Sequence, residues 1–154
     1  MHSMKRIQLA VVFLIAAAFL AGEPARAAGA SDMTCVVGAS DEDFGASGAV
    51  KFWDYDWWVC GPDYATSYSA TMQVACKDLT PGAAYEIWCH TNLYGTYGWY
   101  PVSFAWDSFT ADKRGCGSAK GDLFWGESGV LVEVRRIDPT TVDGYTVVLV
   151  WQQW

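Results

Sequence analysis

Two stretches of alternating apolar and polar residues, joined by a Pro-Gly turn, constrain the fold of this chain more than any other feature. From residue 69 to residue 77 every second side chain is apolar, and the alternation resumes at Tyr85 after the turn at Pro81-Gly82. A period of two is typical of a strand with one buried and one solvent-facing side. We therefore predict two strands here, with Cys76 and Cys89 on their apolar sides.

The same pattern recurs along most of the chain, with turn-forming residues between the segments. The expected strands cover residues 33–37, 48–60, 69–77, 85–89, 102–106, 123–125, 130–135 and 145–151. Residues 92–98 and 110–121 are rich in glycine or polar residues and are expected to be loops. After residue 27 no segment has the 3.6-residue period of an amphipathic helix. About eight short strands predict an all-β sandwich or barrel.

The first 27 residues have the features of a cleaved export signal. Lys5 and Arg6 precede an apolar segment at 9–22, and Ala25-Arg26-Ala27 has the small-x-small form of a cleavage site. The apolar segment is shorter than the roughly 20 residues that a membrane-spanning helix needs. We therefore expect a signal helix at 1–27, a single β domain at 28–154, and a secreted or periplasmic protein without a membrane span after cleavage.

The charge of the chain narrows the choice of partners. The formal net charge is −7, and loss of residues 1–27, which carry two net positive charges, leaves −9. Such an acidic domain repels phosphate backbones, so nucleic acid is not an expected partner. The part of the chain after residue 27 has no basic cluster that would favour a membrane surface.

Five cysteines follow the signal segment, namely Cys35, Cys60, Cys76, Cys89 and Cys116. Export to an oxidising compartment favours disulfide bonds, so all five are candidates for one or two bridges. An odd number leaves at least one thiol outside these bridges. The sequence does not select a pairing.

A turn motif resembles one in a known class of module. The run from Leu79 to Ile87 is similar to the Leu-x-Pro-Gly-x-x-Tyr run of fibronectin type III and related immunoglobulin-like domains, as found in secreted bacterial proteins. This resemblance implies an immunoglobulin-like antiparallel β-sandwich of about eight strands, with Pro81, Gly82 and Tyr85 forming a structural corner. It also implies an adhesive or accessory role, and it carries over no catalytic residue.

Few residues point to catalysis. His90 follows Cys89, but alternation places the two side chains on opposite faces of a strand, so we interpret His90 as a surface residue. Asp54 and Asp56 are spaced to share one strand face, which makes them candidates for paired carboxylate chemistry, but the same spacing occurs in any Asp-x-Asp strand. We expect no metal site, no cofactor and no enzyme.

Tryptophan is the strongest functional signal, because all nine tryptophans follow the signal segment and too many large aromatics are present for one small core. A regular strand over 48–60 would carry Trp53, Tyr55, Trp57 and Val59 on one face. It would carry Phe52, Asp54, Asp56, Trp58 and Cys60 on the other. The candidate binding face consists of Trp53, Tyr55, Trp57, Trp58, Trp99 and Tyr100. The alternative is that these aromatics belong to the core.

Exposed aromatic patches usually mark binding surfaces. The sequence therefore indicates an exported, non-catalytic module that mediates protein interaction or adhesion at the cell surface or in the periplasm. The alternative is a small carbohydrate-binding module in which an exposed Trp/Tyr face stacks on sugar rings.

Overall fold

The computed structural model describes residues 30–38, 41–95 and 98–153, which contain nine strands and no helix. The expected signal segment at 1–27 lies outside these residues. The strands are β1 (Ala30–Asp32), β2 (Thr34–Cys35), β3 (Ser47–Cys60), β4 (Ala65–Lys77), β5 (Ala84–Gly95), β6 (Gly98–Thr110), β7 (Gly117–Gly126), β8 (Val130–Ile137) and β9 (Tyr145–Gln153).

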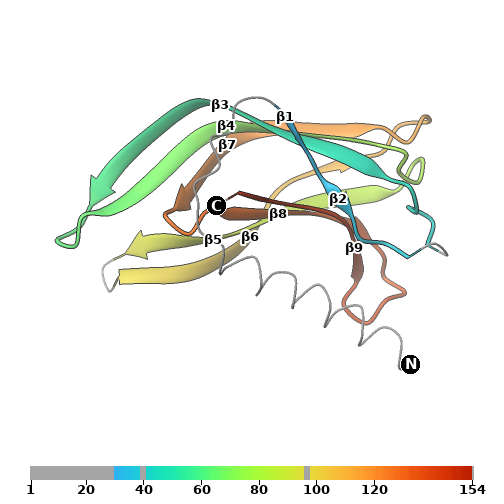
Figure 1. Cartoon of the computed structure of the whole chain (residues 1–154). Coiled ribbons are helices and arrows are strands. Elements are labelled where there is room, and N and C mark those ends of the chain that lie inside the picture. Colours follow the sequence, from blue (N-terminus) through green and yellow to red (C-terminus); the bar gives the residue numbers. More distant parts are fainter. Residues whose placement is uncertain (1–29, 39–40, 96–97, 154) are drawn as a thin grey trace.

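The strands form two antiparallel sheets that pack face to face (Figure 1). Sheet A has the order β1-β3-β4-β7 and sheet B has the order β2-β9-β8-β5-β6. The predicted all-β sandwich is therefore confirmed. The strand count differs because residues 30–32, which precede the predicted strand at 33–37, form β1 in sheet A. Within the predicted strand only Thr34 and Cys35 form a strand, β2 of sheet B, and the buried Met33 lies between β1 and β2.

The core lies between the sheets and consists of the apolar residues that alternate along each strand. Sheet A contributes Val50, Phe52, Met72, Val74 and Leu123, and sheet B contributes Tyr85, Ile87, Cys89, Val132, Val134 and Leu149. Alternation from 69 to 77 and from 85 to 89 therefore predicted the buried faces correctly.

Two predicted loops are partly strand. β5 and β6 extend into the region 92–98, of which residues 96–97 lie outside the description, and β7 begins inside the region 110–121. Both differences have one physical reason. Polar and glycine-rich residues can form a strand when a neighbouring strand provides hydrogen-bond partners for their backbone, as where Ser118 pairs with Ala75.

Tyr85 lies just after the turn at Pro81-Gly82 and joins this turn to a buried carboxylate. Its hydroxyl donates to Asp43 Oδ1 at 2.6 Å and accepts from the backbone N–H of Thr80 at 3.0 Å. Burial, followed by the hydrogen bond to Asp43, raises the pKa of this phenol. The fully buried Asp43 also accepts from the backbone and side chain of Thr80 and pairs with Arg136 at 2.9 Å. One carboxylate thus connects four groups from three residues, Thr80, Tyr85 and Arg136.

The prediction of disulfide bonds is wrong for this structure, because all five cysteines are free. A bridge needs Cα atoms within about 7 Å of each other. The register places no cysteine beside another. Cys76 pairs with Gly48 and Gly117, and Cys89 pairs with Phe104 and Val132.

The five thiols should differ strongly in reactivity. Burial raises the pKa of the Cys76 thiol to about 12 and raises that of Cys89 further, so neither forms the reactive thiolate near pH 8. The exposed Cys116 should therefore react with Ellman's reagent within seconds to minutes, while Cys76 and Cys89 react only after unfolding. Without reductant, all five should titrate in denaturant. A total of three or one would mean that disulfides form.

Candidate binding surface

The aromatic-rich segment forms the far end of the β3–β4 hairpin. Figure 1 shows this hairpin, in green, curving toward the end of the β5–β6 hairpin, in yellow. We call residues 53–68 the arm. Among the described strands β1 is the neighbour of β3 on its open side, and it pairs only with residues 49–51. No described strand therefore pairs with this edge of the arm.

A β-bulge at the base of the arm changes which side chains share a face. Trp53 pairs with Thr71, but Asp56 pairs with Ser69, so β3 contains one extra residue between these pairs. Asp54 lies in the bulge with a φ of 55°. Aspartate is among the few non-glycine residues that tolerate this left-handed conformation.

The bulge makes the predicted alternation of residues 52–60 wrong, because one extra residue exchanges the faces of all later side chains. Trp57 pairs with Tyr68 and lies on the inner face together with Val59. The outer face carries Trp53, Asp56, Trp58 and Cys60. Asp54 and Asp56 consequently do not form the same-face carboxylate pair that regular alternation predicted.

Aromatic rings support the inner face of the arm from the core side. Tyr55 lies 6.3 Å from both Phe52 and Trp125, measured between ring centroids. Tyr68 stacks on Trp125 at 5.9 Å, and Phe52 contacts Trp151 of sheet B at 5.1 Å. Because Phe52 and Trp125 are buried, the rings form one continuous cluster from the core to the surface. Side chains held in this way present a rigid surface.

The side chains on the inner face of the arm that lie beyond the core are exposed to solvent. Trp57 is 65% exposed and Tyr55 is 45% exposed. Val59, on the same face, is 47% exposed. These side chains face the same way as the core residues of β3 but lie beyond the core. They form the inner arm face, which we define as Tyr55, Trp57 and Val59.

The outer face of sheet A holds Trp53 and Trp58 of the predicted set in different surroundings. Lys51 and Lys120 lie over the ring of Trp53, with 5.7 and 4.9 Å between ammonium and ring centroid. Trp58 contacts the edge of Phe124 at 6.1 Å and is 40% exposed. The structure therefore divides the predicted binding face between two sides of sheet A.

Two predicted residues come from sheet B. Tyr100 is exposed. It lies four residues before Phe104 on β6, so the two side chains share a face, and Phe104 packs on the core. Tyr100 therefore lies on the inner face of β6. Trp99 belongs to β6, but its side chain lies outside the described part of the structure. Neither adjoins Trp57 in the strand register, so the two sheets contribute separately to this end of the molecule.

The tip of the arm contacts β5. The hydroxyl of Tyr94 donates to Asp63 Oδ2 at 2.9 Å, and this bond raises the pKa of the tyrosine. Gly61, with a φ of 72°, packs against the ring, and a Cβ at this position would lie 2.3 Å from Tyr94 Cε1. Glycine is thus required at residue 61 both for its backbone conformation and for this close approach.

Gly61→Ala should therefore detach the tip of the arm. We expect faster amide hydrogen exchange at residues 60–65, because the added methyl group and the ring of Tyr94 cannot occupy the same space. Gly144→Ala is the matched control, since Gly144 has a similar φ of 76° but no atom within 4 Å of an added Cβ. Equal exchange at 60–65 in both variants would contradict the contact.

His90, interpreted from the sequence as a surface residue, belongs to a polar cluster on the outer face of sheet B. Its Nδ1 lies 2.8 Å from Ser103 Oγ, and its Nε2 lies 3.2 Å from Glu133 Oε2. Arg135 donates to the same Glu133 oxygen from Nε at 2.8 Å and from a terminal nitrogen at 2.6 Å. The guanidinium lies between the rings of Trp88 and Tyr145, 4.4 and 4.3 Å from their centroids.

The charges of this cluster determine the ionisation of Glu133. Burial alone raises the pKa of its carboxyl, but the hydrogen bonds and charges of His90 and Arg135 outweigh burial and hold this pKa below its usual range. Glu133 is therefore a carboxylate at neutral pH. The sequence contained no sign of this cluster, because its members come from three strands whose register alternation does not specify.

No model of a known protein family matches this chain, and no curated protein matches it. Among the described residues, no cluster of three or more His, Cys, Asp or Glu side chains is arranged to hold a metal ion. The described segments also include no helix of the length and apolarity needed to cross a membrane. Function is therefore inferred from the arm and from the His90 cluster.

Proposed function

We propose that this protein is an exported binding module that engages a protein partner through the inner arm face, at the cell surface or in the periplasm. The observation that carries this proposal is the exposure of Trp57 and Tyr55 on one face of the arm, where Tyr55 packs against the buried rings of Phe52 and Trp125. Tryptophan and tyrosine are enriched among the residues that dominate binding energies. On this account the arm binds without catalysis.

The open edge of β3 favours a protein over other partners. Beyond residue 51 no described strand pairs with this side of β3, so a partner strand can add here next to the inner arm face. The backbone N–H of Trp57 donates to Asp56 Oδ1 at 2.8 Å, so a partner strand would replace this local bond. Asp54 and Asp56 interrupt the edge with charge and a bulge. These features are typical of edges that avoid indiscriminate strand pairing.

A carbohydrate is the second candidate. The exposed indole of Trp57 offers a flat apolar surface on which a sugar ring can stack. This ligand would use the inner arm face without the strand edge.

Protein and carbohydrate partners are distinguished by a chemical treatment of the partner, while the module is left unchanged. Immobilised protein is incubated with an envelope extract from the cells that produce it, after digestion of the extract with protease or oxidation of its sugars with periodate. We expect protease to abolish retention and periodate to leave it unchanged. The opposite result would replace the protein partner by a carbohydrate. Retention that is equal on wild type and on Trp57→Ala would exclude the inner arm face.

A further inference from the structure

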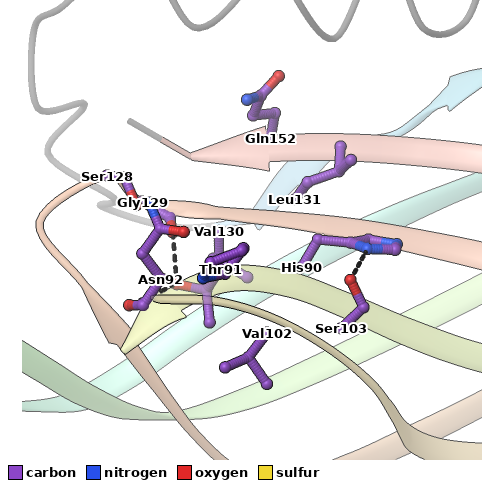
Figure 2. A pocket seen from close by; sticks show the side chains of 11 residues that line it. His90, Thr91, Asn92, Val102, Ser103, Ser128, Gly129, Val130, Leu131 and Gln152 are labelled. Carbon is purple, nitrogen blue, oxygen red and sulfur yellow. Dashed lines mark hydrogen bonds between the residues drawn. The ribbon is translucent and has the colours of Figure 1, made fainter. Parts of the chain in front are cut away.

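We propose a second site, separate from the arm, in which Ser103 is a nucleophile activated by His90 and accepts short acyl groups from esters. The site lies on the outer face of sheet B, where β5, β6 and β8 are neighbours. It is independent of the binding function proposed above. Figure 2 shows the Ser103 hydroxyl and the His90 ring directed at each other.

The shorter of two contacts at His90 Nε2 assigns the ring proton. Arg135, which only donates, lies 3.4 Å from Nε2, and Glu133 Oε2 lies closer, at 3.2 Å. Because a carboxylate only accepts hydrogen bonds, we assign the proton to Nε2, from which it is donated to Glu133. The Nδ1 atom then carries a lone pair and accepts the proton of Ser103, 2.8 Å away. A nucleophile, a base and a group that orients the base are the three parts of an activated hydroxyl. Glu133 is the positioning residue, and Arg135 holds it in place.

A cavity of about 100 Å³ adjoins this pair. Its lining includes Leu131, Asn92 and Gln152, together with Val102 and Val130 of the adjoining strand positions. An apolar cavity of about 150 Å³ holds a benzene ring, so the smaller volume here suits an acyl group of a few carbon atoms. An amide N–H is a suitable donor to the oxyanion that forms when a carbonyl carbon is attacked. Because Ser103 is exposed, an ester can reach it from solvent.

The reaction needs only an ester and water. Ser103 Oγ forms a bond to the carbonyl carbon while its proton passes to His90 Nδ1, and the C–O bond to the alcohol breaks as that proton is returned to the leaving oxygen. Water then gives a proton to His90 and attacks the acyl group. The acid is released, and the proton returns to Ser103.

A fluorophosphonate probe tests the activation of Ser103 directly, because the serine oxygen displaces fluoride to form a stable bond to phosphorus. Peptide mass spectrometry of the labelled protein should place the adduct on Ser103. His90→Gln should slow labelling about 100-fold, the lower end of what a general base contributes. Ser108 is the control, because it is exposed on the same strand but lies opposite Glu86 in the register and not opposite a histidine. It should react no faster than a free serine.

The dependence of labelling on the native fold distinguishes activation from the intrinsic reactivity of a serine. Wild-type labelling of Ser103 should disappear in urea, because unfolding separates Ser103 from His90. The proposal is overturned if Ser103 reacts no faster than Ser108 in native protein, or if His90→Gln is labelled at the wild-type rate.

Discussion

Asp43→Ala is expected to lower the free energy of unfolding by about 3–5 kcal/mol, the range for breaking a buried ion pair. The carboxylate is fully buried and accepts hydrogen bonds from Thr80, Tyr85 and Arg136. Its removal leaves the Tyr85 hydroxyl and one side of the Arg136 guanidinium without an acceptor in a buried site. Since small proteins have only about 5–15 kcal/mol of stability, the loss should be evident in a urea unfolding curve.

Glu42→Ala is the control for this prediction. Glu42 contacts the same Arg136 nitrogen at 3.2 Å, but its side chain is 73% exposed. Exposed ion pairs contribute at most about 1 kcal/mol, so this variant should unfold close to the wild-type midpoint. Tyr85→Phe should lie between the two, at about 1–3 kcal/mol, since it removes a buried hydrogen bond to a charged group while Asp43 Oδ1 keeps its two bonds from Thr80. If Asp43→Ala and Glu42→Ala unfolded at the same urea concentration, the buried network would not stabilise the fold as described.

Trp57→Ala should weaken retention of the envelope partner about 30-fold or more, the effect of losing about 2 kcal/mol at an interface hot spot. The large exposed indole belongs to a strand position paired with Tyr68, which stacks on the buried Trp125, so a partner on this face would cover an extended aromatic surface. Binding is measured as the concentration of soluble wild-type or variant protein that competes the partner from immobilised wild type.

Trp58→Ala provides a matched comparison, because residue 58 is the next residue on the same strand and faces the opposite side. Its indole is also exposed, and it contacts Phe124 on the outer face. We expect this variant to compete within about threefold of wild type, as for most interface-distant residues. A larger loss for Trp58→Ala than for Trp57→Ala would move the binding surface to the outer face.

The parts of the fold that follow from local sequence were predictable. Alternation identified the strands around the Pro81-Gly82 turn and the buried positions of Cys76 and Cys89, because side-chain period and burial are linked residue by residue. The all-β class followed from the number of such segments. The immunoglobulin-like family resemblance remains a prediction, as does export.

The parts that depend on pairing between strands were not predictable. The bulge at Asp54 requires one residue in a left-handed conformation, which alternation does not indicate, and it exchanged the faces of Trp57 and Trp58. The absence of bridges depends on which residues stand opposite each cysteine. The cluster at His90 depends on the register that brings Ser103 and Glu133 to it from two other strands.

The most direct test of the central claim is the fluorine NMR spectrum of protein that contains 5-fluorotryptophan, recorded while the envelope extract is added. The Trp57 and Trp58 resonances are assigned from their phenylalanine variants. We predict that the Trp57 resonance shifts or broadens as the partner binds, while that of Trp58, on the opposite face, stays in place. A response at Trp58 with none at Trp57 would contradict recognition through the inner arm face.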